Sequence, residues 1–215
     1  IALGPRAGEW YVVHDGVVEG ERVVVKGNFK IDSELQIRAR PSMMSPADAS
    51  SAPDPEHETA VLSVPAEFKR RLGGVVDAYL ALQRGLADDR DDQAAADAIV
   101  TVLDQVEMAG LDEAAHEAWM ARLGPLRTSA LKVAGARDID ARRVALSPLT
   151  QRLITVLETF GYQRAEGAVG IFHCPMALDG DGADWLQQAD RTANPYYGSS
   201  MLRCGSRTSI LQPER

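Results

Sequence analysis

Hydrophobic side chains between residues 65 and 161 recur at intervals of three and four positions, which is typical of amphipathic helices. Four such segments follow one another, at residues 68–86, 95–106, 112–133 and 138–160, and Gly161 ends the last. The connections between them are short. Short connections favour antiparallel neighbours, so the pattern predicts an antiparallel four-helix bundle.

Two local features modify this helical pattern. Gly124-Pro125 is expected to interrupt and kink the third segment, and Pro148 to break the fourth near its middle, because proline lacks a backbone donor. An acidic cluster, Asp88, Asp89, Asp91 and Asp92, opens the second segment. Helix capping explains these aspartates best, since carboxylates complement the helix dipole. A calcium loop is the alternative, but its glycine and ligand spacing are missing.

The first 40 residues have a β pattern instead. Residues 10–13 and 21–27 are short runs rich in Val and aromatic side chains, and Asp32 can cap a short helical turn. Two or three strands are too few for an independent sheet. We therefore expect residues 1–40 to be the last strands of a β-domain.

The segment between these patterns resembles a linker. Residues 41–64 contain Pro46, Pro53 and Pro55, and their charged side chains beyond residue 45 are all acidic: Asp48, Asp54, Glu56 and Glu58. Proline and mutually repelling carboxylates disfavour a packed core. The expected organisation is a β-piece at 1–40, an acidic linker at 41–64 and a helical domain at 65–215.

The composition of the chain argues against several classes of protein. The chain has 215 residues, of which 45% are hydrophobic and 25% charged, as in globular proteins. A net charge of -8 argues against nucleic acid as a partner. No apolar run is long enough to span a bilayer, and 2 cysteines cannot form a disulfide framework. Because the chain begins at Ile1 and has no signal peptide, we expect a fragment of a longer protein.

The last 45 residues lose the helical period and contain both cysteines. A strand carrying His173-Cys174 can face a loop carrying Met201 and Cys204. Thiolates and thioethers prefer Cu(I) or Ag(I), while Zn(II) is a weaker candidate through Cys and His. The candidate metal ligands are Cys174, Met176, Met201, Cys204 and His173.

A Cys174–Cys204 disulfide is the alternative for the same residues. Closing a loop of about 30 residues stabilises a fold by roughly 3–4 kcal/mol in the chain-entropy model. The methionines would then be packing residues. A reduced pair binds metal and an oxidised pair does not, so both alternatives stay open.

Catalysis has no support in the sequence. The chain contains no nucleophile elbow, P-loop, His-Glu-x-x-His motif or dinucleotide fingerprint. We therefore expect no enzyme activity and no organic cofactor.

Residues 3–35 resemble part of a known family. Residues 16–34, read as Gly-Val-Val-Glu-Gly-Glu-Arg-Val-Val-Val-Lys-Gly-Asn-Phe-Lys-Ile-Asp-Ser-Glu, are similar to the segment that closes the membrane-proximal domain in CusB-like periplasmic adaptors. These adaptors are the membrane-fusion subunits of heavy-metal RND efflux pumps. Their helical hairpin, lipoyl-like domain and most of their β-barrel would precede Ile1.

The second half resembles a C-terminal extension, of uncharacterised function, found on some of these adaptors. The resemblance rests on residues 173–177, 182–187, 194–198 and 201–205. It implies a periplasmic location, with the full-length protein at the inner membrane, and a role in exporting Cu(I) or Ag(I) as cargo. It also implies an RND pump and an outer-membrane channel as partners, and an oligomeric adaptor. The alternative is a structural docking module held by the disulfide.

Overall fold

The computed structural model describes residues 2–7, 10–15 and 61–214, and the chain divides into two compact units, Ile1–Pro55 and Glu56–Arg215. In the first unit, β1 (Ala2–Ala7) and β2 (Trp10–Asp15) pair as an antiparallel two-stranded sheet. The predicted strand at 21–27, the helical turn at 32–34 and the linker up to residue 60 lie outside the described residues. The expected domain boundaries therefore stay predictions.

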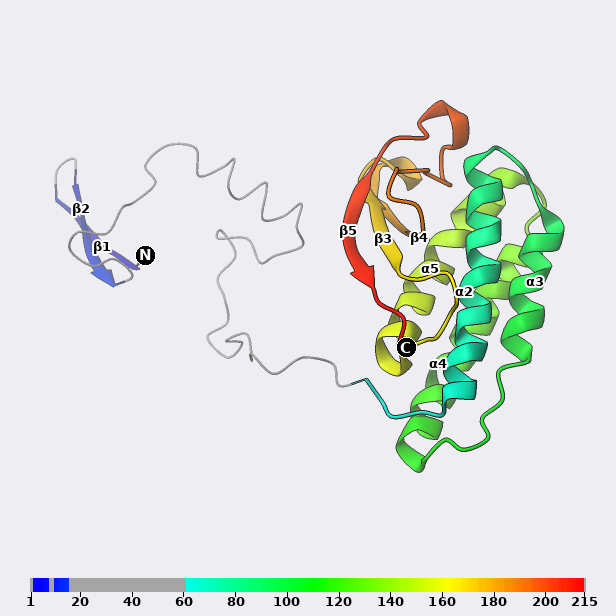
Figure 1. Cartoon of the computed structure of the whole chain (residues 1–215). Helices are drawn as coiled ribbons and strands as arrows, with labels where there is room; N and C mark the ends of the chain where they lie inside the picture. Colours follow the sequence, from blue (N-terminus) through cyan, green and yellow to red (C-terminus); the bar gives the residue numbers. More distant parts are fainter. Residues whose placement is uncertain (1, 8–9, 16–60, 215) are drawn as a thin grey trace. The chain divides into compact units, whose positions relative to one another are not determined.

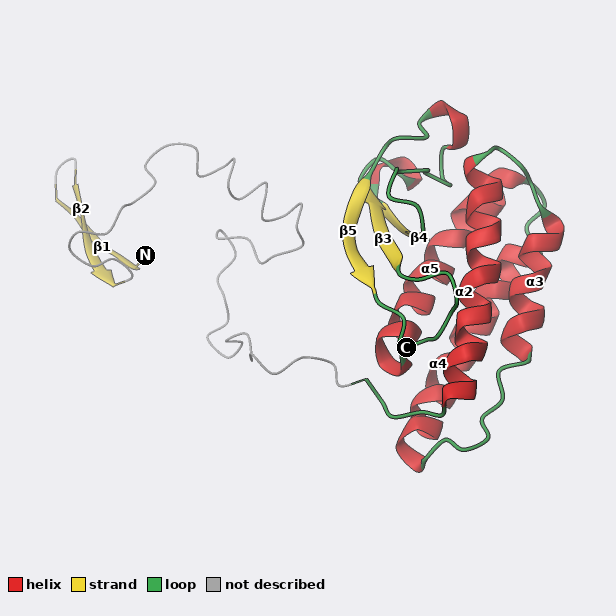
Figure 2. Cartoon of the chain, viewed as in Figure 1, coloured by secondary structure: helices red, strands yellow, loops and turns green. Residues whose placement is uncertain are grey.

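The second unit is mainly helical, as the sequence predicts, and its C-terminal part forms a small three-stranded antiparallel sheet rather than a single strand and loop (Figures 1 and 2). Its helices are α2 (Ala66–Ala87), α3 (Gln93–Asp104), α4 (Glu113–Ala134) and α5 (Ile139–Phe160). Its strands are β3 (Val169–Cys174), β4 (Ala183–Gln187) and β5 (Ser206–Leu211). Two short 3-10 turns, η1 (Leu178–Gly180) and η2 (Gly198–Ser200), lie in the loops between the strands.

Aspartates begin three of the four helices. The side chains of Asp92, Asp112 and Asp138 each accept a hydrogen bond from the backbone N–H three residues later, at 3.0, 2.8 and 2.8 Å. Each bond satisfies one of the donors that a helix N-terminus leaves free. The capping prediction for the acidic cluster therefore holds for Asp92.

The expected breaks at the two prolines are wrong. Helix α4 continues through Pro125 and α5 continues through Pro148, each as one 22-residue element. Proline removes a single backbone bond and is tolerated where packing holds both flanks of the helix. Here the residues just after each proline are buried in the core, at Leu126 and Leu149.

An aromatic cluster joins three helices in the core. Phe68 of α2, Trp119 of α4 and Phe160 of α5 meet edge to face, with ring centroids 5.1–5.8 Å apart. All three are at most 1% exposed. Edge-to-face pairs add to the stabilisation from burial, so this cluster fixes how the three helices meet.

The three-stranded sheet packs on the helices through β4. The strand order is β4-β3-β5, and β4 contacts both α2 and α5 (Figure 1). Phe172 and Trp185 stack across the β3–β4 pair with centroids 5.5 Å apart. The hydroxyl of Tyr79 bonds Thr150 at 2.6 Å and accepts a weaker bond from the Leu186 backbone N–H. Helices and sheet therefore share one core, and β5 remains the exposed edge.

No helix in the described ranges 61–214 is long and apolar enough to cross a membrane.

Candidate functional site

The two cysteines meet at one end of the central strand. Cys174 is the last residue of β3 and is fully buried, while Cys204 is half-buried in the turn before β5. Their sulfur atoms lie 2.8 Å apart, and both thiols are free. Two residues 30 positions apart in sequence are therefore in direct contact through their reactive atoms.

The loop that carries Cys204 is held close to β3 by its neighbours. Gly205 has a φ of +102°, and a Cβ atom there would lie 2.6 Å from the carbonyl oxygen of His173. Only glycine fits both this backbone conformation and this close approach. The buried side chain of Asn194 donates to the Cys204 carbonyl at 3.0 Å. These contacts set the position of the Cys204 thiol.

Both methionines lie on turns next to the cysteines, and both are exposed. Met176 is 56% exposed in the turn that follows Cys174, and Met201 is 37% exposed at the end of η2. The Tyr197 hydroxyl donates to the Met176 carbonyl and thereby joins the two turns. The thioethers are free to change rotamer, because their side chains are not packed in the core.

His173 belongs to a different face of the sheet. Successive residues of a strand point to opposite faces, so the His173 imidazole lies across the sheet from the Cys174 thiol. Its Nδ1 atom lies 2.7 Å from Oδ1 of Asp184, the residue opposite it on β4. The structure thus brings Cys174 and Cys204 together and pairs His173 with a carboxylate instead.

The electrostatics of the site favour the protonated form of the Cys204 thiol. The hydrogen bond with Cys174, partial burial and the charge of Cys174 raise the pKa of the Cys204 thiol to about 11, and a bond from the Met176 backbone N–H opposes this shift only in part. Partial burial and the nearby cysteines also raise the pKa of Tyr197. Any ligand that needs the thiolates must therefore displace protons.

Among the described residues, no group of three or more His, Cys, Asp and Glu side chains is arranged to hold a metal ion. A metal at this site would have the two thiolates as its only charged protein ligands within that part of the chain. Thioethers or a small external ligand would complete its coordination, which suits Cu(I) and Ag(I) better than Zn(II).

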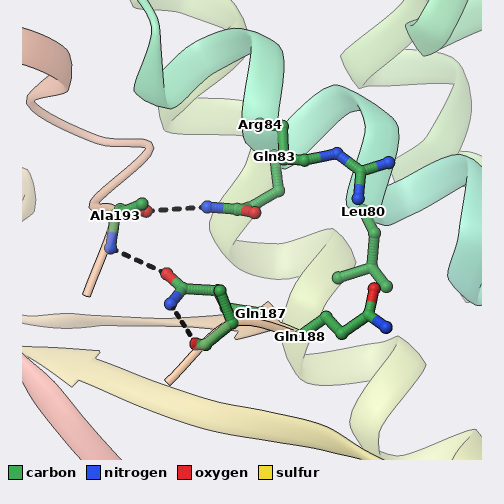
Figure 3. A pocket seen from close by; sticks show the side chains of 7 residues that line it. Leu80, Gln83, Arg84, Gln187, Gln188 and Ala193 are labelled. Carbon is green, nitrogen blue, oxygen red and sulfur yellow. Dashed lines mark hydrogen bonds between the residues drawn. The ribbon is translucent and has the colours of Figure 1, made fainter. Parts of the chain in front are cut away.

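A separate hollow of about 370 Å³ lies between α2 and the loop after β4 (Figure 3). Gln83 donates to the Ala193 carbonyl at 2.7 Å, and the Gln187 side-chain oxygen accepts from the Ala193 N–H at 2.8 Å. The Gln187 amide also donates to the carbonyl of Ala189 at 2.6 Å. These amides are occupied in holding the loop on the helix, so they have a structural role.

Sequence reasoning found the cysteines but missed the residues that position them. Gly205, Asn194 and Tyr197 lie in motifs that are visible in the sequence, yet only the fold reveals their contacts with the turns around the thiols. A glycine directly after a cysteine is a signal that such a loop approaches a strand closely.

A family model matches the helical part of the chain. Residues 75–165 match the model of a family described as "Protein of unknown function (DUF3347)". The matched segment includes most of α2 and all of α3, α4 and α5, and ends before β3. No curated protein and no solved structure shows a significant match to the chain. The chain is therefore similar to this family over its helices, and the cysteine site lies outside the matched residues.

Proposed function

We propose that this chain handles a soft monovalent cation, Cu(I) or Ag(I), through the thiolates of Cys174 and Cys204. In this proposal the four helices form an antiparallel bundle that carries the Cys/Met strand and loop. Residues 1–40 are the last strands of the membrane-proximal domain of a periplasmic adaptor in a heavy-metal RND efflux system. The proposal is supported above all by the contact between the two sulfur atoms, 2.8 Å apart.

Metal binding requires a small opening of the cysteine pair. Two thiolates bound to one ion by metal–sulfur bonds of about 2.3 Å lie roughly 3.8 Å apart if the ion is tetrahedral and about 4.0 Å apart if it is trigonal. The sulfurs at 2.8 Å must therefore separate by about 1 Å. Cys204 lies on a turn and Cys174 ends a buried strand, so we expect Cys204 to move. Met176 or Met201 then supplies a thioether as a further ligand.

The protonation of the pair makes binding depend on pH. Each thiol loses its proton when it ligates the metal, so affinity falls as pH falls. The raised pKa of Cys204 extends this dependence into the alkaline range, because the Cys204 thiol keeps its proton up to about pH 11 when no metal is bound. The exposed thioethers of Met176 and Met201 favour transfer of the cation, because a neutral ligand can release a cation to a partner protein without taking up a proton.

The partners in this proposal are the inner-membrane RND pump and the outer-membrane channel. The chain reaches them as part of an oligomeric full-length adaptor.

The test is an anaerobic titration of the reduced chain with Cu(I) against a chromophoric chelator. We expect one Cu(I) per chain and an affinity loss of about 100-fold or more in Cys174→Ser and Cys204→Ser, with a smaller loss in Met201→Leu and Met176→Leu. Met120→Leu, an exposed methionine on α4, is the matched control and should bind as the unchanged chain does. If the unchanged chain and all the variants bind Cu(I) equally weakly, the proposed metal site is wrong.

The second candidate is a docking module without metal, held by a Cys174–Cys204 disulfide. The same contact favours it, since the sulfurs are within about 1 Å of the roughly 2.05 Å bond length. Oxidation removes two protons and two electrons, which a thiol oxidant of the compartment must accept. Intact mass with and without alkylation, on protein isolated without reductant, decides between the two: blocked thiols favour the disulfide, and alkylated thiols exclude it.

A further inference from the structure

Two arginines from neighbouring helices line one small hollow on the helical face. Arg122 of α4 and Arg152 of α5 border a cavity of about 130 Å³, together with Ala121, Pro125 and Thr155. Most arginines in the range 61–214 pair with a carboxylate, for example Arg127 with Asp104 at 2.7 Å. Arg122 and Arg152 make no ion pair with any described residue.

Arg122 also has a buried donor without a partner. Its Nη1 atom donates to the Ala118 carbonyl at 2.9 Å, which fixes the side chain along its own helix. Its Nε atom is buried and has no hydrogen-bond partner in the described part of the chain. A buried, unsatisfied donor on a charged group is costly. The Nε atom is not itself accessible, so a small shift of the Arg122 side chain toward a ligand in the hollow is needed to satisfy it.

Arg152 is held in place from the opposite helix. Its Nη1 atom donates to the Ser129 hydroxyl at 2.9 Å and to the Pro148 carbonyl at 3.1 Å. Ser129 is 3% exposed, so this contact anchors the guanidinium at the junction of α4 and α5. Arg152 is exposed, and its remaining N–H groups have no acceptor among residues 61–214, so they are open to another partner. Two guanidinium groups that line one hollow create a positive potential there, which favours an anion.

We propose that Arg122 and Arg152 bind a small tetrahedral oxyanion of the phosphate type in this hollow. Guanidinium groups present N–H donors in a planar fork that matches phosphate oxygens. A volume of 130 Å³ is below the roughly 300–1,000 Å³ of sites for larger organic ligands, so the ligand is an inorganic anion or a terminal phosphoryl group. All five lining residues are outside the cysteine site, and this proposal is independent of metal binding.

The test measures binding of inorganic phosphate to the full chain by calorimetry and by thermal unfolding, at constant ionic strength set with chloride. We expect saturable binding and a rise in melting temperature with phosphate. Sulfate should act similarly and acetate weakly. Arg122→Gln and Arg152→Gln should each weaken phosphate binding by roughly tenfold or more, and the double variant should abolish it. Arg191→Gln removes an exposed arginine without an ion pair in the described residues and should bind normally.

Three outcomes would overturn the proposal. The first is no phosphate response in the unchanged chain beyond that of chloride. The second is a response that persists in the double variant or, if the double variant does not fold by circular dichroism, phosphate binding by Arg152→Gln that is as tight as in the unchanged chain. The third is a response to acetate but not to phosphate, which would rule out a tetrahedral ligand.

Discussion

Arg142 shows how a single charged residue is accommodated inside this fold. Its side chain is 1% exposed, and its guanidinium donates hydrogen bonds to α3, to α4 and to the loops next to them. The acceptors are Asp91 Oδ1 at 2.6 Å, the Val133 carbonyl at 2.7 Å, Gln93 Oε1 at 2.8 Å and the Ala136 carbonyl at 3.3 Å. A buried charge is tolerated when its donors are satisfied in this way, so Arg142 ties the loop before α3 to the junction of α4 and α5.

We expect Arg142→Met to lower the free energy of unfolding by about 3 kcal/mol, because it leaves Asp91 and two carbonyls without their donor. Urea unfolding followed by circular dichroism measures this change. Arg137→Met is the control: the Arg137 side chain is 89% exposed, so its loss should cost less than about 0.5 kcal/mol. Equal effects of the two substitutions would contradict the role assigned to Arg142.

Asp89 makes the stability of the fold depend on pH in the acidic range. Hydrogen bonds from the side chain of Ser199, from its N–H at 2.9 Å and from the Arg143 guanidinium at 2.6 Å lower the pKa of Asp89 to about 2. The unfolded chain, with a pKa of about 3.9, binds more protons than the folded chain between these values. The contribution of Asp89 is therefore present above about pH 4 and is lost as pH falls toward 2.

The prediction is that Asp89→Asn flattens the decline in unfolding free energy between pH 4 and pH 2. Asparagine tolerates the positive φ of 56° at this position, so the substitution changes the charge with little backbone strain. Denaturant unfolding at several pH values measures the slope. Asp181→Asn, at an exposed carboxylate without a hydrogen bond in the described residues, should leave the slope unchanged. A slope in Asp89→Asn as steep as in the unchanged chain would contradict the prediction.

At the scale of elements, the N-terminal caps of the helices can be tested one at a time. Asp112 accepts from the Ala115 N–H at 2.8 Å and begins α4. We expect Asp112→Ala to lower the unfolding free energy by about 1 kcal/mol and Asp112→Asn to change it by less than about half as much, since asparagine also caps. Thermal unfolding of both variants supplies the comparison, and an equal loss in both would show that charge, rather than capping, is what matters at this position.

The helices were predictable from sequence because two independent signals agree on them. Apolar spacing marks their length, and the caps at Asp112 and Asp138 mark where two of them begin. The predicted breaks at Pro125 and Pro148 were wrong because the prediction considered only the backbone hydrogen bond that proline removes. It did not include the tertiary packing of the residues on both sides, which keeps each helix continuous.

The candidate site was predictable only in part. Composition alone identifies Cys174 and Cys204 as candidates, but their contact depends on the register of β3 with β5 and on the close approach at Gly205. The position of His173 follows from the alternation of a strand, yet its partner Asp184 depends on the β3–β4 register. The arginine hollow could not be predicted, because Arg122 and Arg152 are brought together only by the packing of α4 on α5.

At the scale of the whole molecule, helices and sheet in the described part share one hydrophobic core that runs from Phe68 to Tyr196. Tyr79 on α2 links the two layers, because its hydroxyl bonds both Thr150 on α5 and the backbone of β4. Shared burial makes partial unfolding of either layer costly. We therefore expect residues 56–215, a piece of about 160 residues, to fold without residues 1–55 and to unfold in one step.

The chain itself supplies the reporters for this prediction. Of its 3 tryptophans, residues 56–215 retain Trp119 in the helical core and Trp185 in the sheet. In Trp185→Phe the remaining fluorescence follows the helices, and in Trp119→Phe it follows the sheet. Within each variant, fluorescence and far-ultraviolet circular dichroism should report the same urea midpoint. If the sheet signal in Trp119→Phe is lost at lower urea than the helical circular dichroism, the sheet unfolds separately and the single-core prediction is wrong.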